Sequence, residues 1–316
     1  MLGFALCGTP ASDAAAQAYP NKPVRIINGF QPGGPTDVIG RIVADVLTRA
    51  MGQSFVVEAK PGAAGNIAGE YVASQPPDGY TLYLAAWSAL IVNKVLYKDL
   101  PYDPDTALSP ISIVANNQLP LTVTMQLPAA TFAEFVAYAK ANPGKLNHGS
   151  PGIGSQPHLA DELLKQRLGF QSEHVPYRGS APFSQALARG EVQWGFDAAN
   201  TALAGLKGGT IRILAITGTQ RDSMLPDTPT LEELGVPDSN WAGYFSLVGP
   251  AALPKDIVAM LYGELARGLK DREVTQRLRN LGLHALATPP EESARVFARD
   301  RAIWAKIVRD NNIKAE

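Results

Sequence analysis

Two short glycine-rich segments carry the clearest chemical signal in this sequence: GFQPGGPTD at residues 29–37 and SPGIGSQ at residues 150–156. Each follows a strand-like run and precedes an apolar pattern of helical period. A helix N-terminus preceded by glycines presents backbone N–H groups without intrahelical partners, together with the positive end of the helix dipole, and attracts anions. Neither segment contains Lys, Arg or His, so the predicted chemistry is anion binding by backbone amides. Taken singly, each segment could equally be a plain turn from strand to helix.

The residues around these glycines exclude the two common nucleotide-binding motifs. Gly29 and Gly34 have the glycine spacing of a phosphate-binding loop, but Pro35 stands where that motif requires lysine. A dinucleotide-binding G-x-G-x-x-G would need a further small residue where Pro157 stands. A carboxylate is therefore the natural candidate for the anion, and no cofactor is expected.

Catalysis is the main alternative to binding. A hydrolase-like triad could be drawn on paper from residues of the second segment and its surroundings, namely Ser150, Ser155, His148, His158 and Asp161. However, the sequence contains no G-x-S-x-G nucleophile motif, and its four histidines have none of the spacings typical of metal sites. We therefore expect a binding protein rather than an enzyme, with no catalytic residue and no metal ion.

Strand-like and helical stretches alternate along the chain and would hold both segments at strand ends. In the first part, strands are predicted at 24–27, 54–58 and 82–85, and helices at 37–50 and 66–74. In the second part, strands are predicted at 146–149, 173–177, 192–196 and 211–217, and helices at 131–142, 158–168, 183–189 and 200–206. Strands separated by helices imply a mostly parallel sheet, so the fold class is α/β.

The alternation occurs in two blocks, which predicts two α/β domains with a ligand cleft between them. Domain 1 comprises residues 19–122 plus 241–316, and domain 2 comprises residues 123–240. Three helices predicted at 255–270, 273–281 and 290–311 form the tail, which we expect to pack back on domain 1. Both glycine-rich segments then lie at the carboxyl ends of strands, where ligands bind in open α/β sheets.

Composition and the N-terminus limit the possible partners and the cellular location. The chain has 316 residues, a formal net charge of -1 and a pI near 6.4, so nucleic acid is not an expected partner. Residues 1–18 end in Ala16-Gln17-Ala18, a pattern typical of signal-peptide cleavage, but lack a basic start, which indicates a truncated or mis-started leader. We expect export to the periplasm without a lipid anchor at Cys7. The alternative is a disordered cytoplasmic extension.

A series of motifs, in order from Tyr19 to the C-terminus, resembles one family. They are PVRIINGFQPGGPTD, EAKPGAAGNIAG, DGYTLYLA, LYKDLPYDP, SPGIGSQPHLA, VPYRGSAP, GFD, LPDTPTLEELG and WAGYFSLVGP. The sequence resembles the extracytoplasmic solute receptors of the tripartite tricarboxylate transporter class, often called Bug or TctC-like receptors. The resemblance implies a two-lobed, type II-like periplasmic binding protein fold and a small organic acid as ligand. It also implies a small and a large membrane subunit as partners, and we expect the receptor to be a monomer.

The matching motifs also imply a set of ligand-binding residues. By resemblance, the ligand carboxylate lies between the two glycine-rich segments and a third loop, and the site residues are Phe30, Gly33, Gly34, Thr36, Asp37, Trp87, Ser88, Gly154, Ser155, His158, Gly179, Ser180, Ala181, Phe183 and Asp197. Trp87 and Phe183 depart from the family pattern and favour an aromatic or apolar-bodied acid, unless both only pack inside the lobes. Asp197 could accept a hydrogen bond from the ligand or from a neighbouring loop.

Several alternatives remain open at this point. The ligand could be an aliphatic dicarboxylate or an aromatic carboxylate. An enzyme acting on a small carboxylate in the same cleft, or a ligand-sensing domain, would use a similar cleft. If backbone amides hold the anion, alanine at Gly34 or at Gly154 should weaken binding, because glycine lets the backbone approach closely or adopt a positive φ. Replacing Arg178, the cation in the loops of the proposed cleft, should then weaken binding less.

Overall fold

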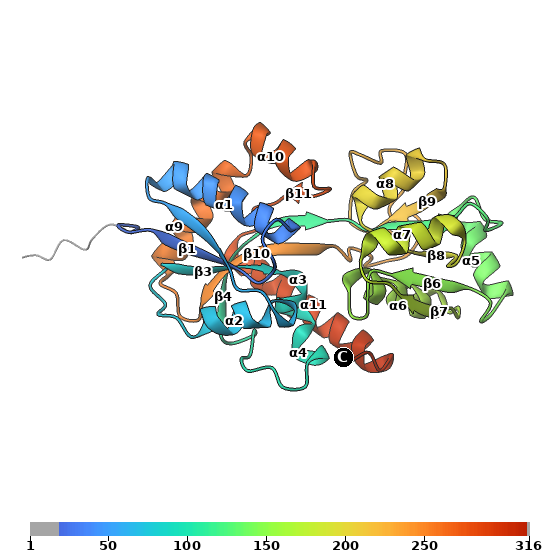
Figure 1. Ribbon diagram of the computed structural model, residues 1–316, viewed down its shortest axis with the longest axis horizontal. Helices are drawn as coiled ribbons and strands as arrows, with labels where there is room; N and C mark the ends of the chain where they lie inside the picture. The colour runs from blue at the N-terminus through green and yellow to red at the C-terminus, as the bar shows by residue number, and fades with distance from the viewer. Residues whose placement is uncertain (1–18, 315–316) are drawn as a thin grey trace, which may run out of the picture.

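The computed structural model describes residues 19–314. The predicted leader and Cys7 lie outside this range. Two sheets with helices on their faces form two lobes, which lie side by side along the long axis of the molecule (Figure 1). Of the helices within residues 19–314, none is both long and apolar enough to cross a membrane. The α/β class and the two-lobed architecture predicted from the sequence are confirmed.

The sheet of the first lobe is mixed, which corrects the expectation of a mostly parallel sheet. Its strand order is β11-β4-β10-β3-β1-β2. The bounds are β1 Val24–Asn28, β2 Phe55–Ala59, β3 Thr81–Ala86, β4 Leu108–Asn117, β10 Gly243–Pro250 and β11 His284–Ala285. Strands β1, β2 and β3 are parallel, whereas β10 is antiparallel to both β3 and β4, and β11 is antiparallel to β4. The antiparallel half arises because β10 returns from the second lobe and enters the sheet from the opposite end.

Helices cover both faces of this first sheet. They are α1 Pro35–Met51, the 3-10 turn η1 Ala63–Gly65, α2 Asn66–Ala73, α3 Trp87–Ile91, α4 Asn93–Leu96, α9 Lys255–Gly268, α10 Arg272–Arg279 and α11 Pro290–Asp310. Side chains alternate along each strand, so Ile26 packs in one core cluster with α1 and α9, and Ile27 packs in another with α2. This two-sided burial explains why the central strands are almost continuously apolar.

The sheet of the second lobe is also mixed, with the order β7-β6-β8-β5-β9. Its strands are β5 Pro120–Thr124, β6 Asn147–Ser150, β7 Glu173–Pro176, β8 Trp194–Phe196 and β9 Ile211–Ile216, and its helices are α5 Phe132–Ala141, α6 Gln156–Leu168, α7 Ser180–Arg189 and α8 Ala199–Lys207. The predicted capping box at the start of α5 is confirmed. Thr131 accepts a hydrogen bond from the Glu134 N–H at 3.2 Å, and the Glu134 side chain accepts one from the Thr131 N–H at 3.2 Å.

Within residues 19–314, the chain crosses between the lobes twice, through residues 118–119 between β4 and β5 and residues 217–242 between β9 and β10. These segments, with the adjoining ends of β4 and β10, form the hinge. The C-terminal helix α11 adds a contact that the sequence did not predict. It packs on β4 and α3 of the first lobe, as expected for the tail, but it also reaches α6 of the second lobe, where Gln166 donates to Asp310 at 3.2 Å (Figure 1). The lobes are therefore connected by two covalent crossings and by one helix that contacts both.

Candidate functional site

A cavity of about 330 Å³ lies where the N-termini of helices from both lobes converge. Its lining includes Pro35 at the start of α1, Trp87 and Ser88 at the start of α3, Ser155 before α6, and Ala198 before α8. These helices follow β1, β3, β6 and β8, so the cavity lies at the carboxyl ends of strands in both sheets, as ligand sites of open α/β sheets do. None of the residues that line this cavity is Lys, Arg or His.

The first glycine-rich loop uses part of its hydrogen-bonding capacity internally. The Gly33 N–H donates to the Asp37 carboxylate at 3.0 Å, and Arg41 pairs with the same carboxylate at 3.0 Å. Burial would raise the pKa of Asp37, but the hydrogen bonds from Arg41 and from the Gly33 N–H hold it below its usual value. The N–H groups of Thr36 and Asp37, in the first turn of α1, have no acceptor within residues 19–314. These two groups are the donors that the loop leaves for an anion.

The second glycine-rich loop is held by hydrogen bonds at the start of α6. The Gly154 N–H donates to His158 Nδ1 at 3.0 Å, and the Ser155 hydroxyl donates to the Gly152 carbonyl at 2.7 Å. Gln156 then connects this loop to both crossings, because it accepts from Asn117 Nδ2 at 3.2 Å and donates to the Trp241 carbonyl at 2.6 Å. Movement at the hinge would therefore shift the N-terminus of α6 through these two hydrogen bonds.

A column of stacked histidines supports the second loop from inside the lobe. His158 stacks on His174 with ring centroids 3.8 Å apart, and His148 lies 5.1 Å beyond. Burial lowers the pKa of His158 to about 4 and that of His174 to about 3, so both rings are neutral near pH 7. Because His158 Nδ1 accepts from Gly154, its proton is assigned to Nε2. His158 therefore positions the loop backbone.

The hydrolase-like arrangement considered from the sequence is not assembled. Ser150 lies 2.7 Å from His174 Nε2, but its side chain is fully buried and also contacts Gly152. The carboxylate of Glu162 pairs with His148 at 3.1 Å instead of with His174, and Asp161 accepts from the Phe196 N–H at 2.8 Å. Within the described residues, no group of three or more His, Cys, Asp or Glu side chains is arranged to hold a metal ion.

The structure separates the sequence-predicted site residues into groups. Trp87, Ser88 and Ser155 line the cavity. The others border the loops just described or the start of α7 without lining the cavity itself: Phe30, Gly33, Gly34, Thr36, Asp37, Gly154, His158, Gly179, Ser180 and Ala181. Their contact with a ligand stays a prediction.

Two predicted residues have roles inside the second lobe. Phe183 is fully buried, and its ring lies where a Cβ at Gly149 or Gly195 would be, so it packs on β6 and β8 and does not support an apolar-bodied ligand. Asp197 is also buried and accepts from the Ala198 N–H at 2.7 Å, at the start of α8. Burial raises the pKa of Asp197 to about 6 despite the hydrogen bonds it accepts. The structure thus supports the structural alternative for both side chains.

Sequence reasoning missed the part of the lining that comes from the hinge and from distant segments. These residues are Asn117, Asn200, Gly243, Tyr244, Phe245, Leu281, Gly282 and Leu283. Asn117, Gly243, Tyr244 and Phe245 fall in the segments near 116–125 and 237–248 where the sequence predicts the crossings between domains, and that location was the signal that could have identified them. Leu281, Gly282 and Leu283 follow α10, and no local pattern indicates that they reach the cavity.

The fold and the cleft together define a bilobal solute-binding protein: two α/β lobes joined by crossing segments, with helix N-termini facing a cavity between them. Residues 39–313 match the model of the tripartite tricarboxylate transporter family receptor, and the chain belongs to this family. This match confirms the resemblance stated from the sequence motifs.

Three solved structures of similar proteins cover nearly the whole chain. Rpa4515 from Rhodopseudomonas palustris with adipate is 34% identical, with a TM-score of 0.76, over 94% of this chain and 99% of that one. MatC from the same organism with bound malate is 29% identical, with a TM-score of 0.71, over 92% of this chain and 100% of MatC. A TctC solute-binding protein from Polaromonas, with no ligand, is 27% identical, with a TM-score of 0.83, over 92% and 99%.

Proposed function

We propose that this receptor captures a small aliphatic dicarboxylate in the cavity between its lobes and delivers it to the small and large membrane subunits of a tripartite transporter. The observation that carries the proposal is the convergence of helix N-termini on a cavity lined by no cationic side chain. The adipate and malate bound by two similar proteins are both dicarboxylates. The proposed periplasmic location depends on the predicted leader. Mass spectrometry of native protein tests it, and we expect the mature chain to begin at Tyr19.

The lining suits a ligand with two charged ends and an apolar body. Backbone N–H groups at the starts of α1 and α6 supply donors for carboxylate oxygens, while Trp87, Phe245 and Leu283 offer apolar surface for methylene groups. Each helix terminus contributes up to ~2 kcal/mol in a partly buried geometry, whereas micromolar affinity requires about 8 kcal/mol. Domain closure therefore has to supply the rest of the affinity by burying the ligand.

A thermal-shift screen tests the ligand class. We expect aliphatic dicarboxylates of four to eight carbons to raise the melting temperature, because a ligand at a hundred times its Kd adds about 2.7 kcal/mol to the free energy of unfolding. Benzoate and phthalate, at the same concentration, serve as the aromatic comparison. Stabilisation by the aromatic acids alone would show that the ligand class is wrong. Chemical conversion of the stabilising acid, followed by proton NMR, would show an enzyme instead of a receptor.

Closure of the lobes on the ligand is the second expected result. The cavity is lined by residues of both lobes, such as Trp87 of the first and Ser155 of the second, so burying a ligand requires the two lobes to come together around it. Solution scattering should therefore give a smaller radius of gyration when the dicarboxylate found by the screen is saturating. A radius that stays the same at saturation would contradict closure, even if the ligand binds.

A further inference from the structure

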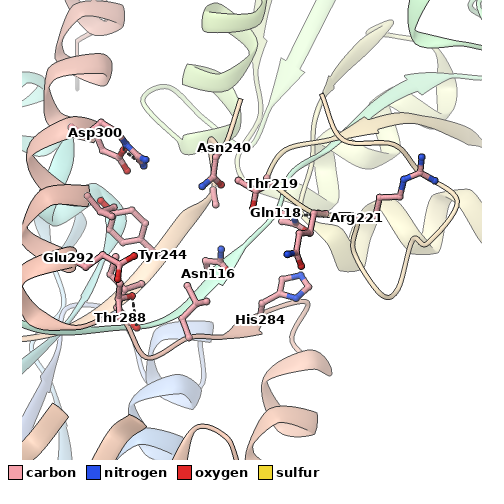
Figure 2. Close-up of a pocket in the computed structure, with 17 residues that line it drawn as sticks. Asn116, Gln118, Thr219, Arg221, Asn240, Tyr244, His284, Thr288, Glu292 and Asp300 are labelled. Atoms are coloured by element: carbon pink, nitrogen blue, oxygen red, sulfur yellow. Dashed lines mark hydrogen bonds and ion pairs between the residues drawn. The ribbon is translucent and has the colours of Figure 1, made fainter. Parts of the chain in front are cut away.

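A second cavity, of about 420 Å³, is lined by residues of the two crossing segments and of α11 (Figure 2). Neighbouring residues of the crossing segments line different cavities: Asn116 and Ala242 line this one, whereas Asn117 and Gly243 line the cleft. Successive side chains of an extended chain point to opposite sides, which explains the alternation. We call this second cavity the hinge-back cavity.

Of the charged side chains that line the hinge-back cavity, only Glu292 has no ion-pair partner within residues 19–314. Its two arginines already have partners, since Arg221 pairs with Glu233 at 3.0 Å and Arg299 pairs with Asp300 at 2.7 Å. His284 likewise pairs with Asp222, at 2.9 Å. The exposed carboxylate of Glu292 has no ion pair within residues 19–314. The cavity therefore favours a positively charged ligand.

Buried acceptors in the same cavity lack donors. The side-chain oxygens of Asn116 and Gln118 are buried and have no hydrogen-bond partner within residues 19–314. Gln118 is only 7% exposed, and its Nε2 donates to the Gln220 carbonyl at 2.7 Å, so the orientation of its amide is fixed and its oxygen is the free atom. A buried acceptor without a donor is energetically unfavourable, and a ligand that donates hydrogen bonds removes this penalty.

We propose that the hinge-back cavity is a second binding site, for a small primary ammonium compound. Glu292 lies on one side of the cavity and Gln118 on the other, with Asn116 between them (Figure 2). One ammonium group pairs with the Glu292 carboxylate, and a second donor reaches the Asn116 and Gln118 oxygens. A diamine can satisfy both ends of the cavity at once, and 1,4-diaminobutane is a suitable probe.

Occupation of this site opposes capture of the carboxylate, a consequence that rests on the proposed function. Glu292 belongs to α11, which packs on β4 of the first lobe, whereas Gln118 lies in the crossing and donates to the Gln220 carbonyl, which follows β9 of the second lobe. A rotation that narrows the cleft separates these groups on the other side of the hinge. A diamine that bridges them therefore binds the open arrangement more tightly than the closed one, and by linkage it lowers the affinity for the carboxylate.

Calorimetric titration with 1,4-diaminobutane at constant ionic strength tests the site. We expect saturable binding to the wild-type protein, at least tenfold weaker binding to Glu292→Gln and to Gln118→Leu, and unchanged binding to Glu291→Gln. Glu291 is the matched control because it is the adjacent exposed carboxylate and does not line the cavity. Butane-1,4-diol, which has the same length without charge, should bind at least tenfold more weakly. No binding of the diamine, or equal binding by all variants, would overturn the proposal.

A second titration tests the coupling and separates it from the proposed function. The apparent Kd for the dicarboxylate found by the screen should rise at least fivefold when 1,4-diaminobutane is saturating, and Glu292→Gln should reduce this rise. An unchanged Kd with the diamine bound would overturn the coupling. If no dicarboxylate binds the protein but the diamine still binds with the expected variant pattern, the proposed function fails and the hinge-back site stands.

Discussion

Replacing Gly154 with alanine is expected to weaken dicarboxylate binding about ten- to a hundredfold, which corresponds to about 1.4 to 2.7 kcal/mol. Gly154 has a φ of +71°, where an alanine residue is strained by about 1–2 kcal/mol. Its added Cβ would also lie 2.9 Å from Leu96 Cδ1, which belongs to α4 of the first lobe. Closure brings these lobes together, so the clash disfavours the closed, ligand-bound arrangement more than the open one.

Gly34→Ala is the matched control for this change, although the sequence alone predicted a similar loss at both glycines. Gly34 has a φ of -78°, and a Cβ there would meet only the Gln31 carbonyl oxygen at an ordinary 3.5 Å, so alanine fits. Arg178→Ala should also bind normally, because this exposed side chain does not line the cavity. Calorimetric titration of the three variants, each with an unchanged circular dichroism spectrum, decides the matter. Loss of binding in Arg178→Ala with normal binding in Gly154→Ala would indicate an arginine clamp.

Acidification is expected to destabilise the wild-type protein more than the variant His158→Gln between pH 7 and pH 4.5. The pKa of His158 is about 4 in the folded protein, below the ordinary value of 6.5, so the unfolded chain binds more protons in this range. Stability contributed by the neutral ring is complete above pH 6.5 and is lost as the pH falls toward 4. A pKa shift of this size changes the free energy of unfolding by at most about 3 kcal/mol.

Urea unfolding at several pH values, compared between wild type and variant, measures this difference. The comparison is necessary because other groups in the lobe titrate as well. The pKa of Asp197, raised to about 6 by burial, makes its protonation stabilising as the pH falls, which opposes the histidine effect. His148 and Lys165 lower the pKa of Glu162 to about 2 despite its burial. Protonation of Glu162 therefore destabilises the protein on acidification, as protonation of His158 does, but only below about pH 4.5. Identical pH dependence of the two proteins would show that His158 is not responsible.

Local signals were sufficient to predict most helices and strands of this fold. The capping box at Thr131 and the apolar period of 37–50 each depend on residues close in sequence, and α5 and α1 form as predicted. The pairing of β4 with β10 was not predicted, because residues more than a hundred positions apart determine it. The helices α3 and α4, of five and four residues, are too short to show a helical period in the sequence.

The candidate site shows the same division between local and long-range information. The sequence indicated which helix N-termini would offer N–H groups, but it did not show that Asp37 and His158 would accept from Gly33 and Gly154. It also did not show that Phe183 would be fully buried, because that depends on the glycines of two strands beneath its ring. Donors, acceptors and burial are set by the packed lobes, so only the general location and the kind of ligand followed from the motifs.

The alternation of residues along the crossing segments also means that the length of the hinge matters as much as its composition. Substituting Asn116 or Ala242 alters one cavity and leaves the lining of the other in place. Deleting one residue between β4 and β5 would instead shift the register and exchange the inward and outward sets of side chains, as a one-residue slip does in a strand. The two cavities can therefore be changed independently by point substitutions, whereas an insertion or deletion in this segment alters both together.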